Sequence, residues 1–257
     1  MSCFLYASDV HGRESTYERL FGMEADAIVL GGDLLPHPRG MGTGLLDLQR
    51  RFAREFLAPC LRERPCYWIL GNDDWAAAGA ELEGAGTPIH GRAVPFLDGT
   101  WIAGYSCVPV TPFGMKDFDR FDREGWDAPA AYGRCMRSGP EGLVPVSLET
   151  VRGWGTIEGD LERLGGLSDP ARTVYVMHAP PLGSGLDVLW DGRPLGSAAV
   201  RAFLEKRRPP LSLHGHIHES PGVRRLGPTV CVNPGDGLSE FRAVRVDLED
   251  FSVTPLR

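Results

Sequence analysis

Residues 3–12 read CFLYASDVHG, a short apolar run that leads directly into an aspartate and a histidine. Similar apolar runs lead into an aspartate at residues 27–33 (AIVLGGD) and into an asparagine and two aspartates at residues 67–74 (YWILGNDD). Between these runs, residues 14–21 and 45–61 have the apolar spacing of helices. Strands that alternate with helices form parallel sheets with right-handed crossovers. The N-terminal part of the chain therefore predicts a β-α-β-α-β unit and an α/β fold.

The rest of the chain continues with helices and strands and shows neither an internal repeat nor a linker. One helix is expected from about residue 147 to 164 and another near 197–206. Strands are expected at residues 89–96, 100–104, 173–177, 211–213, 229–232, 243–246 and 251–253. The last of these alternate in polarity as half-exposed antiparallel strands do. We therefore predict a single domain over residues 1–257.

The stretch from about residue 105 to 145 lacks the periodicity of the rest. It combines Trp126, Tyr132 and several phenylalanines with Asp, Arg, Gly and Pro. A long segment of this kind inside a compact domain is usually a lid or a binding loop. We expect it to lie over the functional site and to select the substrate.

Composition narrows the class of protein. The 257 residues carry 27 basic and 34 acidic side chains, a net charge of −7, which disfavours a partner such as long nucleic acid. No apolar run is long enough to span a membrane, and the N-terminus lacks the features of a signal peptide. The six cysteines are scattered, as packed thiols in a reducing compartment are. A cytoplasmic protein is expected.

Polar clusters follow five of the predicted strands, and each contains oxygen or imidazole donors. They are residues 9–12 (DVHG), 31–33 (GGD), 71–74 (GNDD), 178–181 (HAPP) and 214–218 (HGHIH). Taken singly, each could be a helix cap, a turn or a buried histidine. Together they hold five of the seven histidines, at the strand ends where ligands bind in α/β sheets. A functional site is the better interpretation.

The donors are oxygens and imidazole nitrogens without thiolates. Such a set suits divalent Mn, Fe, Zn, Ni or Co rather than a structural zinc or a calcium site. The number of donors is sufficient for two ions joined by a carboxylate, with manganese favoured. A pair of ions can activate a bridging hydroxide and neutralise the charge of a phosphoryl group. Phosphoryl transfer is the reaction that this donor set predicts.

The five motifs resemble, in order, the pattern of the calcineurin-like metallophosphoesterase superfamily: D-x-H, G-D, G-N-H-(D/E), a lone H and G-H-x-H. The match covers nearly the whole chain and looks like the small bacterial type. The resemblance implies a four-layer α/β/β/α sandwich of two mixed β-sheets flanked by helices, with a metal site at the C-terminal ends of the strands. It also implies ligands: Asp9, His11 and His218 for the first metal, Asn72, His178 and His216 for the second, and Asp33 between them.

One position departs from the pattern. Asp73 stands where the family has a histidine that is thought to protonate the leaving oxygen. A carboxylate beside two cations is ionised and cannot donate a proton. Another group must then serve, with His37 or His90 available only if its loop folds over the site. His214 is extra to the motif and is interpreted as packing or support for a ligand.

The predicted activity is hydrolysis of phosphodiesters or activated phosphate esters by a metal-bridging hydroxide, with Asn72 and Asp73 as the catalytic candidates beside the metals. Simple alkyl monoesters are the less favoured substrates. Two alternatives stay open. One is a nucleotide phosphodiesterase or nuclease whose small substrate stacks on Trp75, Trp126 or Tyr132. The other is a catalytically weak scaffold or interaction protein, which is disfavoured because all seven donors are present. The oligomeric state and the substrate are left undetermined.

Overall fold

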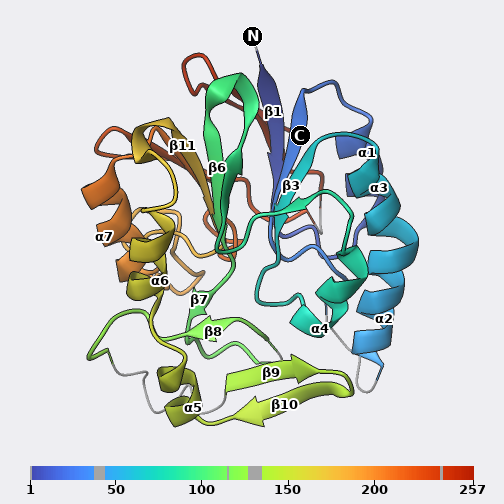
Figure 1. Cartoon of the computed structure of the whole chain (residues 1–257), viewed down its shortest axis with the longest axis vertical. Coiled ribbons are helices and arrows are strands. Elements are labelled where there is room, and N and C mark those ends of the chain that lie inside the picture. Colours follow the sequence, from blue (N-terminus) through green and yellow to red (C-terminus); the bar gives the residue numbers. More distant parts are fainter. Residues whose placement is uncertain (1, 38–43, 115, 127–134, 238–239) are drawn as a thin grey trace.

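The computed structural model describes residues 2–37, 44–114, 116–126, 135–237 and 240–257. Two six-stranded sheets pack face to face in the centre, and helices cover their outer faces (Figure 1). The predicted four-layer α/β/β/α sandwich is confirmed.

The first sheet contains the N-terminal unit. Its order is β16 (Val253–Leu256), β15 (Ala243–Asp247), β1 (Cys3–Ala7), β2 (Ala27–Gly31), β3 (Cys66–Ile69) and β4 (Thr87–Pro88). Strands β1 to β4 run parallel, whereas β15 and β16 are antiparallel to their neighbours. The β-α-β-α-β unit is therefore present as predicted, and β1, β2 and β3 end at the same edge.

The second sheet is built from the later part of the chain. Its order is β13 (Gly222–Leu226), β14 (Thr229–Asn233), β12 (Leu211–Leu213), β11 (Thr173–Met177), β6 (Trp101–Tyr105) and β5 (Ala93–Pro95). The four central strands are parallel, and β13 and β5 are antiparallel edge strands. Strands β11 and β12 consequently end side by side.

Helices α1 (Glu14–Phe21), α2 (Leu45–Phe52), α3 (Ala58–Arg62) and α4 (Ala76–Gly79) cover the first sheet, and α6 (Ile157–Leu164) and α7 (Ala198–Arg207) cover the second (Figure 1). A π-helical turn, Ala53–Leu57, joins α2 to α3. The expectation of one helix over 147–164 was wrong. The chain forms α5 (Leu148–Gly153) and α6, because Gly155 takes a positive φ of 90° and Thr156 caps a new helix. Short 3-10 turns lie at Ala80–Leu82, Leu97–Gly99 and Pro170–Arg172.

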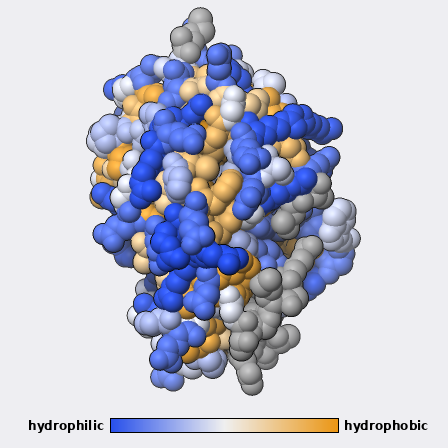
Figure 2. All heavy atoms as spheres, turned by 90° about the vertical axis from the view of Figure 1, so that its right-hand side faces the viewer, coloured by the Kyte–Doolittle hydropathy of each residue, from blue (hydrophilic) through white to orange (hydrophobic). Residues whose placement is uncertain are grey.

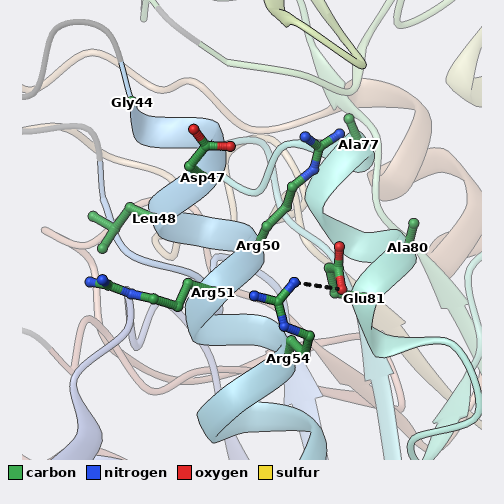
Figure 3. A pocket seen from close by; sticks show the side chains of 9 residues that line it. All are labelled: Gly44, Asp47, Leu48, Arg50, Arg51, Arg54, Ala77, Ala80 and Glu81. Atoms are coloured by element: carbon green, nitrogen blue, oxygen red, sulfur yellow. Dashed lines mark ion pairs between the residues drawn. The ribbon is translucent and has the colours of Figure 1, made fainter.

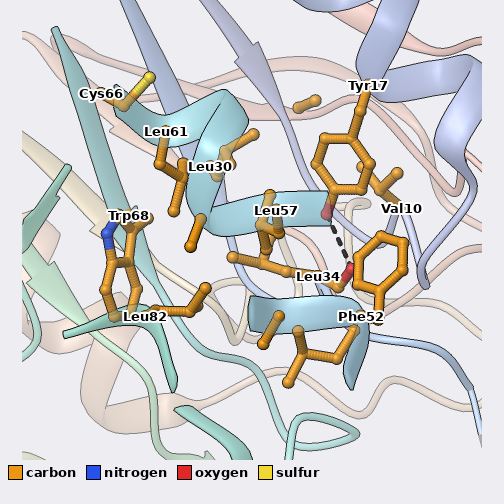
Figure 4. Close-up of a cluster of buried hydrophobic side chains, with 14 of the residues drawn as sticks. Val10, Tyr17, Leu30, Leu34, Phe52, Leu57, Leu61, Cys66, Trp68 and Leu82 are labelled. Carbon is orange, nitrogen blue, oxygen red and sulfur yellow. Dashed lines mark hydrogen bonds between the residues drawn. The ribbon is translucent and has the colours of Figure 1, made fainter. Parts of the chain in front are cut away.

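Apolar side chains fill the space between the layers. Phe4 and Tyr6 of β1 point between the sheets and pack with Val174 and Val176 of β11, all fully buried. A second cluster lies between the first sheet and its helices (Figure 4), where the Tyr17 hydroxyl donates to the Leu34 carbonyl (2.7 Å). This contact fixes α1 against the loop after β2, one of the loops that carry polar motifs.

The segment after β6 contains more regular structure than its sequence indicates. It forms β7 (Val108–Pro109), β8 (Asp119–Arg120) and a hairpin of β9 (Cys135–Gly139) and β10 (Gly142–Val146). These elements and α5 extend the molecule at one end of the sandwich (Figure 1). Tyr132 lies outside the described residues.

The structure shows a polar face over the helices of the first sheet (Figure 2) and reduced cysteines, as expected from the sequence for the thiols. Polar side chains cover most of the face that carries α1 to α4 (Figure 2). All six cysteines are free thiols. Among the described residues, none of the helices has the length and apolar character of a membrane-spanning segment.

Candidate metal centre

Polar residues from both sheets meet where the parallel strands end. The first sheet supplies Asp9 and His11 after β1, Asp33 after β2 and Asn72 after β3, and the second supplies His178 after β11 and His216 and His218 after β12. The structure brings all seven of these sequence-predicted donors together. Contacts that cross from one sheet to the other hold the cluster.

One half of the cluster is formed by Asp9, His11, Asp33 and His218. Each offers a ligand atom, and these atoms lie within 4.8 Å of one another. His218 Nε2 is 3.1 Å from Asp9 Oδ1 and 3.3 Å from His11 Nε2. Two imidazole nitrogens and carboxylate oxygens at these distances face a common point, as the ligands of a divalent cation do.

The other half is centred on His178. Its Nε2 lies 3.3 Å from Asp33 Oδ2 and 3.2 Å from Asn72 Oδ1, and its ring is 5.3 Å from that of His216. His178 Nδ1 lies 2.9 Å from the Gly31 carbonyl, which can only accept a hydrogen bond. That contact places the proton on Nδ1 and directs Nε2 toward the cluster, the usual support for a metal-binding histidine. Asp33 therefore faces both halves.

The residues fit a pair of divalent cations. His11 Nδ1 and His216 Nε2 are buried and have no hydrogen-bond partner among the described residues. Unpartnered buried nitrogens are rare unless a ligand satisfies them. The His216 ring lies next to that of His178 and lines the cavity at the centre, so its unpartnered nitrogen is a candidate ligand atom.

The electrostatic field of the cluster attracts positive charge. Burial alone would lower the pKa of His178, but the adjacent Asp33 carboxylate raises it to about 10. Burial likewise disfavours protonation of His218, and the hydrogen bond with Asp9 raises its pKa to about 9. For His216, burial dominates and lowers the pKa well below the ordinary value. Carboxylates that favour protonation of His178 and His218 also favour divalent cations at the same point.

The backbone around the donors is strained. Asp9, His11, Asp33 and His216 have positive φ angles between 49° and 66°, and they make up half of the eight non-glycine residues with positive φ in the described chain. Such strain concentrates at functional sites because it directs side chains where regular structure would not.

Two motif glycines permit the close approach of the loops. A Cβ atom on Gly71 would lie 2.2 Å from Asp33 Oδ1, and one on Gly215 would lie 2.2 Å from Asp9 Oδ2. Any side chain at either position would therefore displace a predicted ligand. These contacts explain the glycines of the third and fifth motifs.

Asp73 is paired with a histidine from another loop. His37 Nε2 lies 2.9 Å from Asp73 Oδ2, and its ring packs edge-on against His11. Burial would raise the pKa of Asp73, but the hydrogen bond with His37 lowers it below the ordinary value. The loop after β2 thus folds over the site. This is the condition under which His37 is expected to be available as a proton donor.

His90 lies elsewhere in the molecule. Its Nδ1 accepts a hydrogen bond from the Ser106 N–H (2.9 Å), and its ring stacks on Tyr105. It lines a separate cavity beside Asp160. Of the two histidines that could replace the missing one, the structure brings only His37 into the cluster.

Sequence reasoning missed two buried residues that hold the loops in place. Asp74 accepts backbone hydrogen bonds from Gly71, Leu34 and Leu35 (2.9, 3.0 and 2.7 Å), so it joins the loops after β2 and β3. Burial raises the pKa of Asp74 to about 8. Gln49 on α2 donates to the Asp73 carbonyl (2.8 Å). Gln49 does not stand out in sequence, and Asp74, the acidic residue that ends the third motif, was assigned no role because both residues act through backbone atoms.

A cavity of about 180 Å³ opens onto the centre. Its lining includes Asp33, Asn72 and His216 together with Phe113 and Gly114 from the segment after β6. The Phe113 ring lies 5.6 Å from that of His216. That segment is also tied to the centre by the Asp117 N–H, which donates to the Asn72 carbonyl (2.8 Å).

The remaining expectations concern packing residues. His214 is buried with its nitrogens 2.9 Å from Ser212 Oγ and 3.0 Å from the Met177 and Ala179 carbonyls, which confirms its interpretation as packing and support. Trp75 is buried in the core, so the expectation that a substrate could stack on it was wrong. Trp126 is half-buried against Phe121.

A larger groove lies away from the centre. It occupies about 790 Å³ between α2 and α4, where Arg54 pairs with Glu81 (3.6 Å; Figure 3). Arg50 and Arg51 also line it, but none of the predicted ligands does. The larger cavity therefore does not coincide with the candidate metal centre.

Comparison with known proteins identifies the family. A sequence model described as calcineurin-like phosphoesterase matches residues 4–220. The chain belongs to the calcineurin-like phosphoesterase family. This confirms the resemblance seen in the motifs and makes the protein a phosphoesterase by family, one whose members hold a dinuclear divalent metal centre. Among curated proteins, a sequence search finds no significant match.

Solved structures show the same fold. The protein TT1561 of Thermus thermophilus is 18% identical, with a TM-score of 0.59 over 100% of this chain and 98% of that chain. A dimetal phosphatase from Danio rerio is 11% identical, with a TM-score of 0.55 over 95% of this chain and 92% of that chain. At these identities the likeness concerns the fold alone.

Proposed function

We propose that this phosphoesterase is a hydrolase of phosphodiesters and activated phosphate esters that depends on two divalent metal ions, with manganese as the favoured metal. The observation that carries the proposal is the convergence of carboxylate and imidazole donors from both sheets on one small cavity, with Asp33 facing both halves. A cavity of about 180 Å³ suits a phosphate group and its near substituents.

Asp9, His11 and His218 hold the first metal in this proposal, Asn72, His178 and His216 hold the second, and Asp33 binds both. When bound, the ions supply positive charge to the phosphate oxygens and lower the pKa of a water molecule. The chain supplies orientation. The Gly31 carbonyl fixes the His178 ring. The Asp9 carboxylate accepts a hydrogen bond from the backbone N–H of His216 (3.1 Å) and thereby positions the loop after β12.

Asn72 and Asp73 are the residues proposed to act beside the metals. Asn72 Nδ2 donates to Asp73 Oδ1 (2.9 Å), so the amide is oriented within the cavity wall, where it can also contact a phosphate oxygen. Asp73, with its lowered pKa, is a hydrogen-bond acceptor. Without a donor at this position, esters with stable leaving groups are the preferred substrates, which favours aryl and nucleotide-like diesters over alkyl monoesters.

The segment from about residue 105 to 145 is proposed to select the substrate. Phe113 and Gly114 line the cavity, and the Asp117 N–H holds the segment against the Asn72 carbonyl. Lys116 is fully buried and pairs with Asp119, with its Nζ also 2.8 Å from Thr111 Oγ1. These contacts fix Phe113 in the position where a substituent of the phosphate would meet it.

Metal dependence and substrate preference test this function together. The protein is stripped with a chelator, reloaded with manganese and assayed with bis-p-nitrophenyl phosphate and with p-nitrophenyl phosphate. We expect activity only after reloading, and faster hydrolysis of the diester. Absence of turnover with every divalent metal would instead support a scaffold that keeps the fold. Faster hydrolysis of the monoester would overturn the proposed preference.

A further inference from the structure

A tryptophan stands in solvent on a loop that is hydrogen-bonded to the wall of the cavity at the candidate metal centre. Trp190 is 87% exposed, and among the described residues no other large apolar side chain exceeds 53%. It lies in the long loop that connects β11 to α7. This loop begins with His178, the predicted ligand after β11. Scattered exposed apolar residues need no explanation, but a tryptophan held in water by a well-ordered turn does.

The turn that carries Trp190 is a closed hairpin. Val188 and Pro194 form an antiparallel bridge, and the Leu189 N–H donates to the Arg193 carbonyl (3.0 Å). The Gly192 N–H donates to the Leu189 carbonyl (2.9 Å), and Gly192 has a positive φ of 84°. A type I turn followed by a left-handed glycine is a standard three-residue hairpin loop. It fixes the backbone on either side of Trp190.

Side-chain contacts reinforce this turn. Asp191 pairs with Arg193 (2.7 Å), so the two charges beside the tryptophan neutralise each other. At the base, the buried Asp187 carboxylate accepts the backbone N–H groups of Gly183 and Gly185 (2.7 and 3.1 Å). The tip therefore offers a flat apolar surface with little net charge on a rigid support.

The hairpin is attached to the wall of the metal cavity. Ser220 Oγ accepts the Val188 N–H (3.1 Å) and donates to the Val188 carbonyl (2.7 Å). Its neighbour Glu219 lines the cavity, and His218 is the next residue back along the chain. One residue spans at most about 3.8 Å, so the two steps from Val188 to Trp190 keep the tip within roughly 20 Å of the cavity wall.

We propose that Trp190 is a substrate-binding residue that stacks on a flat aromatic group, such as a nucleobase, in the part of the substrate distal to the hydrolysed phosphate. The inference rests on the proposed function and adds the substrate class: an extended phosphodiester with an aromatic end. An indole that is almost fully exposed and carried on a rigid turn binds planar groups without requiring particular hydrogen bonds. The hydrogen bonds of the hairpin with Ser220, the neighbour of Glu219 in the cavity wall, keep that contact within roughly 20 Å of the reaction site.

Kinetics with a series of esters tests the proposal. The substrates share one leaving group, p-nitrophenolate, on a phosphodiester that carries methyl, one, two or three thymidine nucleotides. For the manganese-loaded wild type, KM falls at the length at which a base reaches Trp190. The substitution Trp190→Ala removes that fall, raising KM for the longer esters about fivefold or more, and leaves the methyl ester unchanged. The value of kcat stays within twofold, and Trp190→Phe restores most of the binding.

Controls separate this role from the alternatives. Leu167→Ala removes another exposed apolar side chain, 53% exposed, and leaves every KM unchanged. Equal KM values for wild type and Trp190→Ala along the whole series would overturn the proposal. Conversion of a dimer to a monomer by Trp190→Ala, with KM unchanged, would also overturn it and would assign the tryptophan to a contact between copies.

A binding readout distinguishes failure of this inference from failure of the proposed function. Thymidine oligonucleotides with phosphorothioate linkages are titrated while tryptophan fluorescence is followed in wild type and in Trp190→Phe. Quenching that is lost in the variant supports stacking even if no ester is hydrolysed, in which case only the hydrolytic function fails. Quenching that is equal in the two proteins contradicts the role of Trp190 even if hydrolysis is normal.

Discussion

The loops that carry the candidate ligands and the segment at residues 106–146 border the same cavity but are built differently. Each ligand loop follows a strand that is buried along all or most of its length, and four of the donors in these loops sit on strained backbone at positive φ. The strands of the other segment, where it is described, belong to neither central sheet, and contacts such as that of Asp117 with Asn72 position it. The comparison teaches that the fold itself positions the donors, whereas local interactions position the residues that meet the substrate.

Loss of the shared carboxylate is expected to have the largest effect. Asp33→Asn keeps the shape of a residue that is 2% exposed but removes the charge that faces both halves of the centre. Mutation of a residue that only supports a metal ligand lowers metal affinity or activity by about 10–100-fold. Loss of the ligand itself should therefore abolish measurable hydrolysis. Initial rates with bis-p-nitrophenyl phosphate check this. Asp47→Asn, in the groove between α2 and α4, serves as the control; activity in Asp33→Asn would refute the assignment.

The leaving group is expected to matter next, because Asp73 accepts rather than donates a hydrogen bond. Positioned general acids accelerate reactions by about 10²–10⁴-fold. Wild type should therefore hydrolyse alkyl esters far more slowly than aryl esters, with a steep dependence on leaving-group pKa. Asp73→His should flatten that dependence and raise monoesterase activity. A shallow dependence in wild type would show that another donor, such as His37, already acts, and His37→Ala would then steepen it.

Phe113 tests the other region in this comparison, the segment after β6. Phe113→Ala removes a ring that lies 5.6 Å from that of His216 in the cavity wall. An aromatic contact contributes about 0.5–1.5 kcal/mol, so KM should rise about two- to tenfold while metal affinity stays unchanged. Val144→Ala, an exposed position in the same segment, is the matched control. A change in metal affinity without a change in KM would mean that the segment supports the ligands instead.

The smallest expected effect is on the pH dependence of the stability of the folded protein, and it involves His90. Burial lowers the pKa of this histidine, whereas the unfolded chain takes up its proton near pH 6.5. The unfolded state therefore binds more protons below that pH, and this contribution to stability is lost as the pH falls. His90→Asn keeps an acceptor for the Ser106 N–H but does not titrate. Urea unfolding from pH 7.5 to 5 should give a shallower loss of stability in the variant; parallel curves would contradict the assignment.

The fold and the donors could be predicted because they depend on short-range patterns. The apolar runs of β1, β2 and β3 and the polar residues directly after them define both the sheet and its functional edge. The partnership of His37 with Asp73 could not be predicted, since it depends on how the loop after β2 folds back. The roles of Gln49 and Asp74 could not be predicted, because their partners include backbone atoms of other loops.

The segment after β6 shows the limits of periodicity. In its hairpin, β9 (CMRSG) mixes residue types and β10 (GLVPV) contains glycine and proline, and most positions are half-exposed or exposed, so the sequence lacks the apolar alternation of a strand. The break between α5 and α6 depends on the positive φ of Gly155 and on the Thr156 cap. A glycine and a threonine within a helical pattern are also compatible with one continuous helix.

The number of metal ions bound per chain tests the central claim most directly. The protein is stripped, loaded with manganese, freed of unbound metal and measured by elemental analysis. We expect two ions per chain in wild type and fewer in His216→Ala, which removes the unpartnered Nε2 from the half around His178. One ion per chain in wild type, or two ions in His216→Ala, would contradict a dinuclear centre formed by these residues.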